Sequence, residues 1–342
     1  MTADLEQRIV RYLAHRMPEE GAISVLSLSR IHGGASRETF RVRVAFERGG
    51  ERGLIFRRDP VSTLIETERQ TEFAAYRSFQ DSVVPVPRAL FLEPSLEWLE
   101  RPFFIMEEIE GCLAGSILAA DAYGLHRRKI GESFFSILGH IAKRDVATSD
   151  LARHVENPTA DAAWQSELNK WEAVIDEDEL EPQPIARAAI RWLRRYPPPK
   201  AQRISVVHGD YRSGNFLHDG QGNIKAILDW EMAHLGDPLE DLAWALDPLW
   251  SADRTLAGGM MTRSESIAVW EKASGLKADP HALAWWSIFA SLKGLAIWIS
   301  SAKEYQSGAN NDPVMAFSGL YCFPFHNKRL ADLLVEEGAH AL

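Results

Sequence analysis

VVHGDYRSGNFLHDGQGNIKAILDWEMAHLGDPLEDLAW, the segment from Val206 to Trp244, holds the most informative pattern of the chain. Its first apolar run predicts a short strand, which delivers Asp210 into a turn. The amide Asn215 follows this turn, and a second apolar strand ends at Asp229. Two short neighbouring strands therefore bring the side chains of Asp210, Asn215 and Asp229 near one point.

These three side chains have the chemistry of a magnesium site. Mg²⁺ binds few protein oxygens and keeps phosphate and water in its remaining positions. A carboxylate that stays free of the metal can accept a proton from a hydroxyl. The alternative is a turn whose Asp and Asn only cap neighbouring elements, which explains each residue singly but not the set with two strands between its members. A zinc site at His208 and Asp210 lacks a convincing third ligand.

The spacing His-x-Asp-x-x-x-x-Asn, followed by Asp229, resembles that of the kinase-like phosphotransferases, which include aminoglycoside phosphotransferases and choline kinases. The fuller string is most similar to the subgroup that contains the kinase-like domain fused to some acyl-CoA dehydrogenases. The resemblance covers Ser29 to Trp244 and is weakest between Asp121 and Lys200.

This resemblance implies an α+β, two-lobed protein-kinase-like fold, with a small antiparallel-sheet N-terminal lobe and a larger, mainly helical C-terminal lobe. It also implies an ATP- and Mg²⁺-dependent phosphotransferase. Asp210 corresponds to the catalytic carboxylate, which orients or deprotonates the acceptor hydroxyl, and Asn215 and Asp229 correspond to the Mg²⁺ ligands. His208 corresponds to a motif histidine whose role is mostly architectural. A protein kinase is a poorer match, because the chain has no Asp-Phe-Gly or Ala-Pro-Glu segment.

The sequence patterns change from strand-rich to mainly helical near Glu110, which predicts two lobes of residues 1–110 and 111–342. The second unit reads as helices, except for a strand-rich block at 203–230. In the first unit, apolar spacing and turn residues predict a helix over 5–17 stopped by Pro18, a hairpin over Phe40–Arg58 with its turn at Glu47–Gly53, a polar helix over 62–80, and strands over 88–93 and 103–110.

Two glycines in the first unit suit a nucleotide lid. Gly33 and Gly34 stand between two predicted strands, where glycine lets backbone N–H groups approach phosphate oxygens. A plain Gly-Gly hairpin is the alternative. Members of the family usually carry Ser-Asn after the glycines, and here Ser36 is followed by Arg37. The resemblance therefore assigns Ser36 to the phosphates and leaves the role of Arg37 open.

The phosphate clamp departs from the usual kinase pattern, because the chain has no lysine before Lys129. The segment LIFRRDP resembles the form of the subgroup in which arginine replaces that lysine. By this match Arg57 holds the phosphates and Arg58 points to the opposite face as a solvated edge charge, and a one-residue register error would exchange them. The partner carboxylate is expected from the following helix, with Glu72 preferred over Glu68.

The segment FFIMEEIEG resembles the hinge between the lobes of a kinase. By this match the backbone groups of Glu107 and Ile109 bind an adenine edge, and Met106 lines the pocket of the base. The segment GDPLED resembles another family motif, which contains Asp237 and Asp241. A helix start with Asp237 as its cap before Pro238 is favoured over contact with substrate.

Composition excludes several other classes of protein. The chain of 342 residues has a formal net charge of −10, which argues against binding to nucleic acid through phosphate neutralisation. Its two cysteines cannot form a disulfide framework, and the N-terminus lacks the apolar core of a secretory signal, so we expect a cytoplasmic protein. The apolar run from Ala282 to Ala302 contains Lys293, and a buried core helix is favoured over a membrane span. The oligomeric state is left open.

The acceptor is the least determined part of the prediction. Arg212 lies two residues after Asp210, and if it faces the cleft it favours an acidic or phosphate-bearing alcohol. The subgroup resemblance also points to a hydroxy acid or a hydroxyacyl compound. The 11 tryptophans keep a choline-like acceptor open through an aromatic cage, although core packing explains them as well. An aminoglycoside kinase and a nucleotide-binding pseudokinase or scaffold remain as alternatives.

Overall fold

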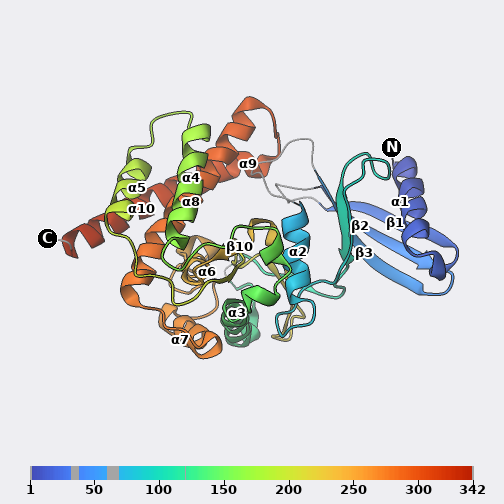
Figure 1. The fold of residues 1–342 in the computed structure, drawn as a ribbon, viewed down its shortest axis with the longest axis horizontal. Coiled ribbons are helices and arrows are strands. Elements are labelled where there is room, and N and C mark those ends of the chain that lie inside the picture. Colours follow the sequence, from blue (N-terminus) through green and yellow to red (C-terminus); the bar gives the residue numbers. More distant parts are fainter. Residues whose placement is uncertain (1, 32–37, 60–68, 120, 341–342) are drawn as a thin grey trace.

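The computed structural model describes residues 2–31, 38–59, 69–119 and 121–340, and these form two lobes (Figure 1). This is the α+β, two-lobed layout predicted from the sequence. The elements of the N-terminal lobe are α1 (Thr2–Arg16), β1 (Ile23–Ile31), β2 (Glu38–Phe46), β3 (Gly50–Arg58), α2 (Arg69–Phe79), β4 (Ala89–Glu93) and β5 (Phe103–Glu107).

The five strands of this lobe form one antiparallel sheet in the order β1-β2-β3-β5-β4. The predicted hairpin is present, but its turn is shorter than expected. Phe46 pairs with Gly50, so only residues 47–49 connect the strands. The prediction that the turn extends to Gly53 is wrong, because cross-strand pairing continues through the glycine-rich segment that composition alone assigns to a loop.

The two faces of the sheet are covered by different helices. The stripe of α1 that includes Ile9 and Leu13 packs against one face, and Val42 and Phe56 are buried beneath it. Helix α2 covers the other face and stands between the sheet and the C-terminal lobe (Figure 1). Of the helix expected over 62–80, the part from Arg69 to Phe79 is observed, and residues 60–68 lie outside the described residues.

The C-terminal lobe contains the predicted helices and, among the described residues, two small sheets. Strand β7 pairs with β10, and β8 joins β6 to β9. Its elements are β6 (Leu113–Ala114), α3 (Arg127–Ala142), α4 (Ala163–Asp178), α5 (Pro184–Arg195), β7 (Ser205–Val207), β8 (Phe216–His218), β9 (Ile224–Ile227), β10 (His234–Gly236), α6 (Leu239–Ala245), α7 (Arg263–Ser274), α8 (Pro280–Ser307), α9 (Pro313–Phe317), a π-helical turn (Ser318–Cys322) and α10 (Phe323–His340).

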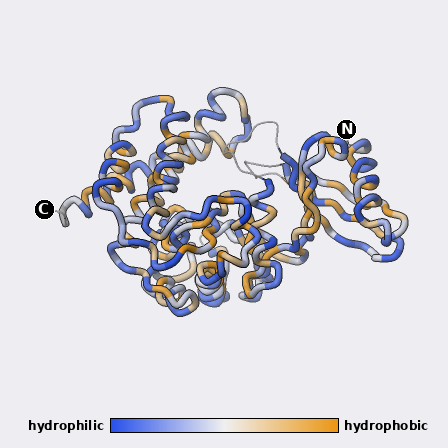
Figure 2. Tube along the Cα trace, viewed as in Figure 1, coloured by the Kyte–Doolittle hydropathy of each residue, from blue (hydrophilic) through white to orange (hydrophobic). Residues whose placement is uncertain are grey.

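The apolar helix α8 is the centre of this lobe. Asp279 caps its start by accepting from the backbone N–H of Ala282 at 2.8 Å, and Gly308 ends it in the left-handed conformation. It is long and apolar enough to cross a membrane, but 89% of its most apolar window is buried inside the protein. It packs against α4, α5, α6 and α10 as a core helix, and the hydropathy of the trace shows apolar segments in both lobes (Figure 2).

Candidate active site

Arg57 stands at the junction of the two lobes. The side chain comes from β3 and is 9% exposed, and its guanidinium lies 2.6 Å from Glu72 of α2. The same guanidinium donates to Asp229 Oδ1 at 3.1 and 3.2 Å and to Glu231 Oε2 at 3.4 Å. Three carboxylates from two parts of the chain, α2 and the segment after β9, therefore surround one cation. The contact of Arg57 with Glu72 agrees with the expectation from the sequence, whereas the contact with Glu231 was not predicted.

Arg58 points to the opposite face of the sheet, as strand alternation requires. It donates to Glu38 Oε2 at 2.7 and 3.0 Å and to the carbonyl of Leu99 at 3.1 Å. Arg101 reaches the same Glu38 carboxylate at 2.5 Å. The expectation of a solvated edge charge is wrong, because Arg58 is 13% exposed and paired. Glu68, the alternative partner for Arg57, lies outside the described residues.

Asp229 occupies a left-handed backbone conformation at the end of the second short strand. Its φ is 69°, and its backbone N–H donates to the hydroxyl of Tyr76 at 3.0 Å. From this position the carboxylate accepts from Arg57. Burial alone would raise the pKa of Asp229, but Arg57 and Arg212 lower the pKa below its usual range overall. Asp229 is therefore an ionised carboxylate that can ligate a cation.

Asp210 is held from three directions. Arg212 Nε donates to both of its carboxylate oxygens at 3.1 Å, and Trp244 Nε1 donates to Oδ1 at 2.8 Å. Asn215 Nδ2 donates to Oδ2 at 2.7 Å and to the Asp210 carbonyl at 2.9 Å. With the amide nitrogen of Asn215 used in this way, the amide oxygen is the atom that can face a metal ion.

Backbone pairing brings the two proposed metal ligands to the same place. The N–H of Leu228 donates to the carbonyl of Asn215 at 2.8 Å, so Asn215 lies beside the strand end that precedes Asp229. The donor set is an amide oxygen and an ionised carboxylate, which are ligands of Mg²⁺. The residues present therefore fit the metal that the sequence analysis expected, with Asp210 adjacent.

His208 ties the two strand ends together. Its Nδ1 accepts from the backbone N–H of Asp210 at 3.1 Å, which leaves Nε2 to donate to the carbonyl of Leu228 at 2.9 Å. Burial lowers the pKa of His208 to about 4, so the ring is neutral. It orients backbone and takes no metal, which fits the architectural role implied by the resemblance.

Asp241 contacts the backbone just before Asp210, and the sequence did not predict this contact. Its carboxylate accepts the backbone N–H of His208 at 2.6 Å and that of Gly209 at 2.9 Å, and thereby supports the turn that carries Asp210. Asp237 does sit at a helix start: it accepts the N–H of Leu239 at 2.9 Å. The sequence singles out Asp241 only through its spacing of four residues from Asp237. This spacing does not reveal that Asp241 binds the backbone of His208 and Gly209.

Arg212 faces Asp210 and also stacks on the ring of Trp250, with 5.0 Å from its guanidinium carbon to the ring centroid. It is 23% exposed, so the charge is neither fully solvated nor sealed in the core. Of the two orientations left open by the sequence, the structure therefore shows the one in which Arg212 lies beside Asp210. An aromatic cage for a choline-like acceptor is disfavoured at these two rings, because cations of the protein already lie over them. Arg212 stacks on Trp250, and Lys293 lies 5.3 Å from the centroid of Trp244.

The expected nucleotide contacts are described only in part. Gly33, Gly34 and Ser36 lie outside the described residues. Met106 is buried in β5 and belongs to the apolar cluster that continues into the C-terminal lobe. The N–H of Glu107 donates to the carbonyl of Arg88 at 3.0 Å, so of its two backbone groups only the carbonyl can meet a base. Ile109 follows the strand in the connection between the lobes.

Comparison with known proteins places this geometry in a family. A sequence profile of the phosphotransferase enzyme family matches residues 27–278 of the chain. Mouse acyl-CoA dehydrogenase family member 10 is 26% identical over 223 residues, which are 64% of this chain and 20% of that protein. A probable acyl-CoA dehydrogenase of Arabidopsis thaliana, IBR3, is 24% identical over 65% of this chain and 28% of its own length. The chain thus spans under a third of these relatives.

Solved structures show the same kinase-like fold. A putative aminoglycoside phosphotransferase from Ralstonia eutropha has a TM-score of 0.72 and 20% identity, with 93% of this chain and 95% of that one covered. Choline kinase LicA from Streptococcus pneumoniae has a TM-score of 0.62 and 16% identity, with 96% and 99% covered. The aminoglycoside phosphotransferase APH(4)-Ia, in a ternary complex with ADP and hygromycin B, has a TM-score of 0.56 and 17% identity, with 95% and 97% covered.

Proposed function

The chain belongs to the phosphotransferase enzyme family, and from this premise we propose that it transfers the γ-phosphoryl group of Mg·ATP to a hydroxyl of a small molecule. In the transfer, the acceptor oxygen forms a bond to the γ-phosphorus while the bond to the β–γ bridging oxygen breaks, and ADP leaves. The hydroxyl proton passes to Asp210. The observation that carries the proposal is the convergence of Asp210 and Asn215 with Asp229 and Arg57 at the lobe junction.

The nucleotide would lie between residues 1–110, which act as its lid, and residues 111–342, which carry the catalytic motif. Arg57 would hold the phosphates, with Glu72 fixing the guanidinium from the buried side. The purine would face Met106, the Glu107 carbonyl and Ile109, and Gly33, Gly34 and Ser36 would cover the phosphates. Asn215 and Asp229 would hold Mg²⁺, which when bound neutralises charge on the phosphates.

Asp210 is arranged to align an acceptor rather than to bind metal. Trp244 and Asn215 fix its carboxylate by hydrogen bonds at 2.8 and 2.7 Å, so the reactive oxygen has little freedom. Catalysis in this arrangement comes mainly from positioning and from electrostatic stabilisation of the transferring group. An enzyme of this kind is favoured over a nucleotide-binding scaffold, because the scaffold has no need of an oriented carboxylate beside the metal ligands.

The acceptor is proposed to be an anion, a hydroxy acid or a hydroxyacyl compound. Arg212 places a positive charge directly beside Asp210, which repels a polycationic aminoglycoside and attracts a carboxylate or phosphate. A choline-like cation would compete with Arg212 and Lys293 for the tryptophan faces that they already occupy. The fold neighbours keep both aminoglycoside and choline-type kinases as the second candidate. We place the reaction in the cytoplasm, since both cysteines are free thiols.

The test is phosphoryl transfer from Mg·ATP to a mixed panel of acceptors, followed by mass spectrometry. The panel holds hydroxy acids, hydroxyacyl-CoA thioesters, sugars, aminoglycosides and choline. Asp210→Asn runs beside the wild type, and Asp332→Asn, an exposed site on α10, is the matched control. We expect one acceptor class to gain a phosphoryl group with wild type and Asp332→Asn but not with Asp210→Asn. Mg·ATP binding without transfer to any acceptor supports the scaffold instead, and absence of Mg·ATP binding overturns the proposal.

A further inference from the structure

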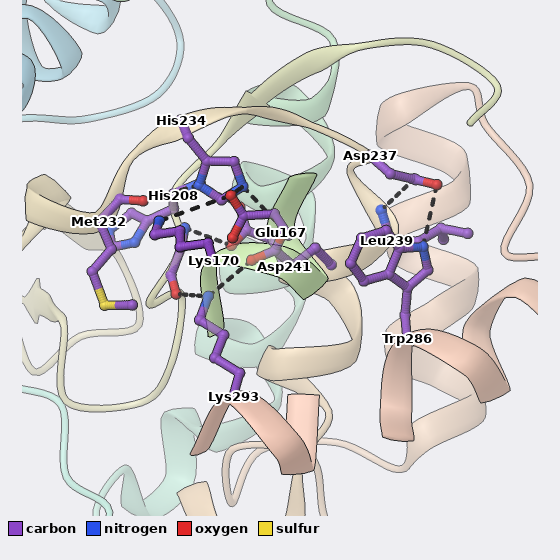
Figure 3. A network of polar contacts seen from close by, with 12 residues as sticks. Glu167, Lys170, His208, Met232, His234, Asp237, Leu239, Asp241, Trp286 and Lys293 are labelled. Carbon is purple, nitrogen blue, oxygen red and sulfur yellow. Dashed lines mark hydrogen bonds and ion pairs between the residues drawn. The ribbon is translucent and has the colours of Figure 1, made fainter. Parts of the chain in front are cut away.

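Lys293 lies in the middle of the apolar helix α8, where a charge is costly unless it is paired. The side chain is 1% exposed, and its ammonium donates to the carbonyl of Gly209 at 2.6 Å and to Glu240 Oε1 at 2.8 Å. Figure 3 shows this ammonium directed from α8 toward a polar cluster that includes Glu167, His234 and Asp241. This cluster lies next to the turn at Gly209–Asp210, which we call the catalytic turn. The residue immediately after Gly209 is Asp210, so α8 is joined directly to the backbone that carries the proposed catalytic carboxylate.

The carboxylates of this cluster are balanced by the ammonium of Lys293. Glu240 Oε2 lies 3.0 Å from His234 Nε2, and Glu167 lies 3.5 Å from the same nitrogen. These three side chains have metal-type ligand atoms within 4.8 Å of one another, but the Lys293 ammonium already supplies the positive charge at Glu240. Burial alone would lower the pKa of Lys293, whereas Glu240 and Glu167 raise the pKa above its ordinary value overall. The ammonium is therefore charged.

Gly209 is held on both of its peptide groups. Asp241 accepts its N–H at 2.9 Å, and Lys293 donates to its carbonyl at 2.6 Å. Its φ is +83°, and an added Cβ would lie 2.4 Å from the carbonyl oxygen of Met232, so the backbone is closely packed on the remaining side. The turn that presents Asp210 thus has fixed contacts from α6, α8 and the segment before β10.

A second path leads from Lys293 to the carboxylate itself. The ammonium lies 5.3 Å from the ring centroid of Trp244 and 5.5 Å from that of Trp171. Trp244 in turn donates its indole N–H to Asp210 Oδ1 at 2.8 Å. The cation therefore contacts both the backbone that precedes Asp210 and the ring that orients its side chain, which a charge serving only to neutralise Glu240 would not need to do.

On the basis of the proposed function, we propose that Lys293 is a positioning residue for Asp210. It fixes the catalytic turn through the Gly209 carbonyl and the Asp210 carboxylate through Trp244. Its loss is expected to lower turnover by about 10- to 100-fold, because small displacements of a reacting group have effects of this size. Binding of Mg·ATP is expected to be unchanged, since Arg57, Asn215 and Asp229 are not in contact with Lys293.

The single variant Lys293→Met would leave Glu240 buried without its cation and can fail to fold. The decisive protein is therefore Lys293→Met/Glu240→Gln, which removes both charges. Lys303→Met is the matched control, because Lys303 lies on the same helix and pairs with Asp178 near the surface. The readouts are Tm, Mg·ATP affinity, and phosphoryl transfer to water or to the acceptor found in the panel.

We expect the double variant to keep its Tm and its Mg·ATP affinity but to lose turnover, while Lys303→Met keeps all three. Recovery of wild-type turnover together with Tm would overturn the proposal, because Lys293 would then serve only to balance Glu240. Reduced turnover with unchanged Mg·ATP affinity is not expected for an ion pair that only stabilises the fold.

A second measurement does not depend on the activity. The indole N–H resonance of Trp244 is recorded by ¹H–¹⁵N NMR and assigned with Trp244→Phe. Asp210→Asn is expected to move this resonance strongly in the wild-type background and much less in Lys293→Met/Glu240→Gln, where we expect the hydrogen bond to Asp210 to be weakened. Equal movement in both backgrounds would overturn the proposal. If the wild type transfers no phosphoryl group at all, the proposed function fails. The NMR comparison then still tests whether Lys293 positions Asp210.

Discussion

The guanidinium of Arg57 donates to Asp229 Oδ1 at 3.1 and 3.2 Å, and this contact joins the sheet of the N-terminal lobe to the proposed catalytic motif of the C-terminal lobe. The proposed phosphate clamp and a proposed Mg²⁺ ligand thus neutralise each other in this state. Nucleotide phosphates compete with Asp229 and Glu231 for Arg57, while Mg²⁺ competes with Arg57 for Asp229. Binding of the two charged partners is therefore expected to be mutually favourable.

Arg57→Met is expected to weaken Mg·ATP binding by about 10- to 100-fold, because charge-assisted hydrogen bonds to phosphate are lost. It also leaves Glu72 buried without its cation, which is expected to cost about 3–5 kcal/mol of unfolding free energy. Isothermal titration calorimetry with Mg·ATP and urea denaturation measure the two effects. Arg57→Lys keeps a charge and reports on folding.

Arg58→Met is the control for that experiment, because Arg58 contacts Glu38 on the other face of the sheet. We expect its Mg·ATP affinity to equal that of the wild type. An effect on affinity from Arg58 rather than Arg57 would show that the assignment along β3 is wrong by one residue.

Asp229→Asn is expected to raise the Mg²⁺ concentration for half-maximal activity by about tenfold or more, since an ionised ligand becomes a neutral one. Asparagine tolerates the left-handed backbone conformation at this position, so the fold should be retained. The measurement is a Mg²⁺ titration of phosphoryl transfer at fixed ATP, with circular dichroism as the folding control. A titration curve that matches wild type would remove Asp229 from the metal site.

Arg212→Gln is expected to lower kcat/KM by about 10- to 100-fold for acceptors that carry a carboxylate or phosphate. Neutral alcohols should lose less, because they do not use the guanidinium charge. The two kinds of acceptor are compared in the same mixture by mass spectrometry, and Arg254→Gln, an exposed site, is the control. Equal losses for charged and neutral acceptors would mean that Arg212 acts only by holding Asp210.

Much of the proposed catalytic site can be predicted from the sequence, because its residues lie close together along the chain. Asp210, Asn215 and Asp229 are separated by two short strands, and strand pairing between neighbours follows from the apolar runs and turns. The orientations of Arg57 and Arg58 follow in the same way from the period of two along β3. The Glu47–Gly53 turn was mispredicted because glycine content reports flexibility, whereas the cross-strand register determines where a turn ends.

The supporting contacts could not be predicted because they join distant parts of the chain. Asp241 reaches His208 from 33 residues away, and Lys293 reaches Gly209 from 84 residues away. Asp241 lies in the first turn of α6 and Lys293 in the apolar helix α8, and neither local pattern indicates these contacts. Their function depends on how α6 and α8 pack beneath the catalytic turn, which no local periodicity encodes.

Asp237 gives a pH-dependent prediction that is independent of catalysis. Burial raises its pKa to about 6, even though hydrogen bonds from Leu239 N–H and Trp286 Nε1 oppose this rise. A carboxyl whose folded pKa exceeds its unfolded value contributes stability below the unfolded pKa, and this contribution is lost as the pH rises through the folded value. The wild type therefore loses up to about 3 kcal/mol at this site between about pH 4 and pH 6.

Asp237→Asn does not titrate, so its unfolding free energy should rise relative to wild type over the same interval. Any hydrogen bond that the amide makes less well adds a constant offset at every pH and does not change the slope. Urea denaturation of both proteins at pH 4.5, 5.5, 6.5 and 7.5 separates the two effects, because titrations that are the same in both proteins cancel in the difference between them. A difference that stays flat across this range would show that the Asp237 carboxyl is ionised in the folded protein at all of these pH values.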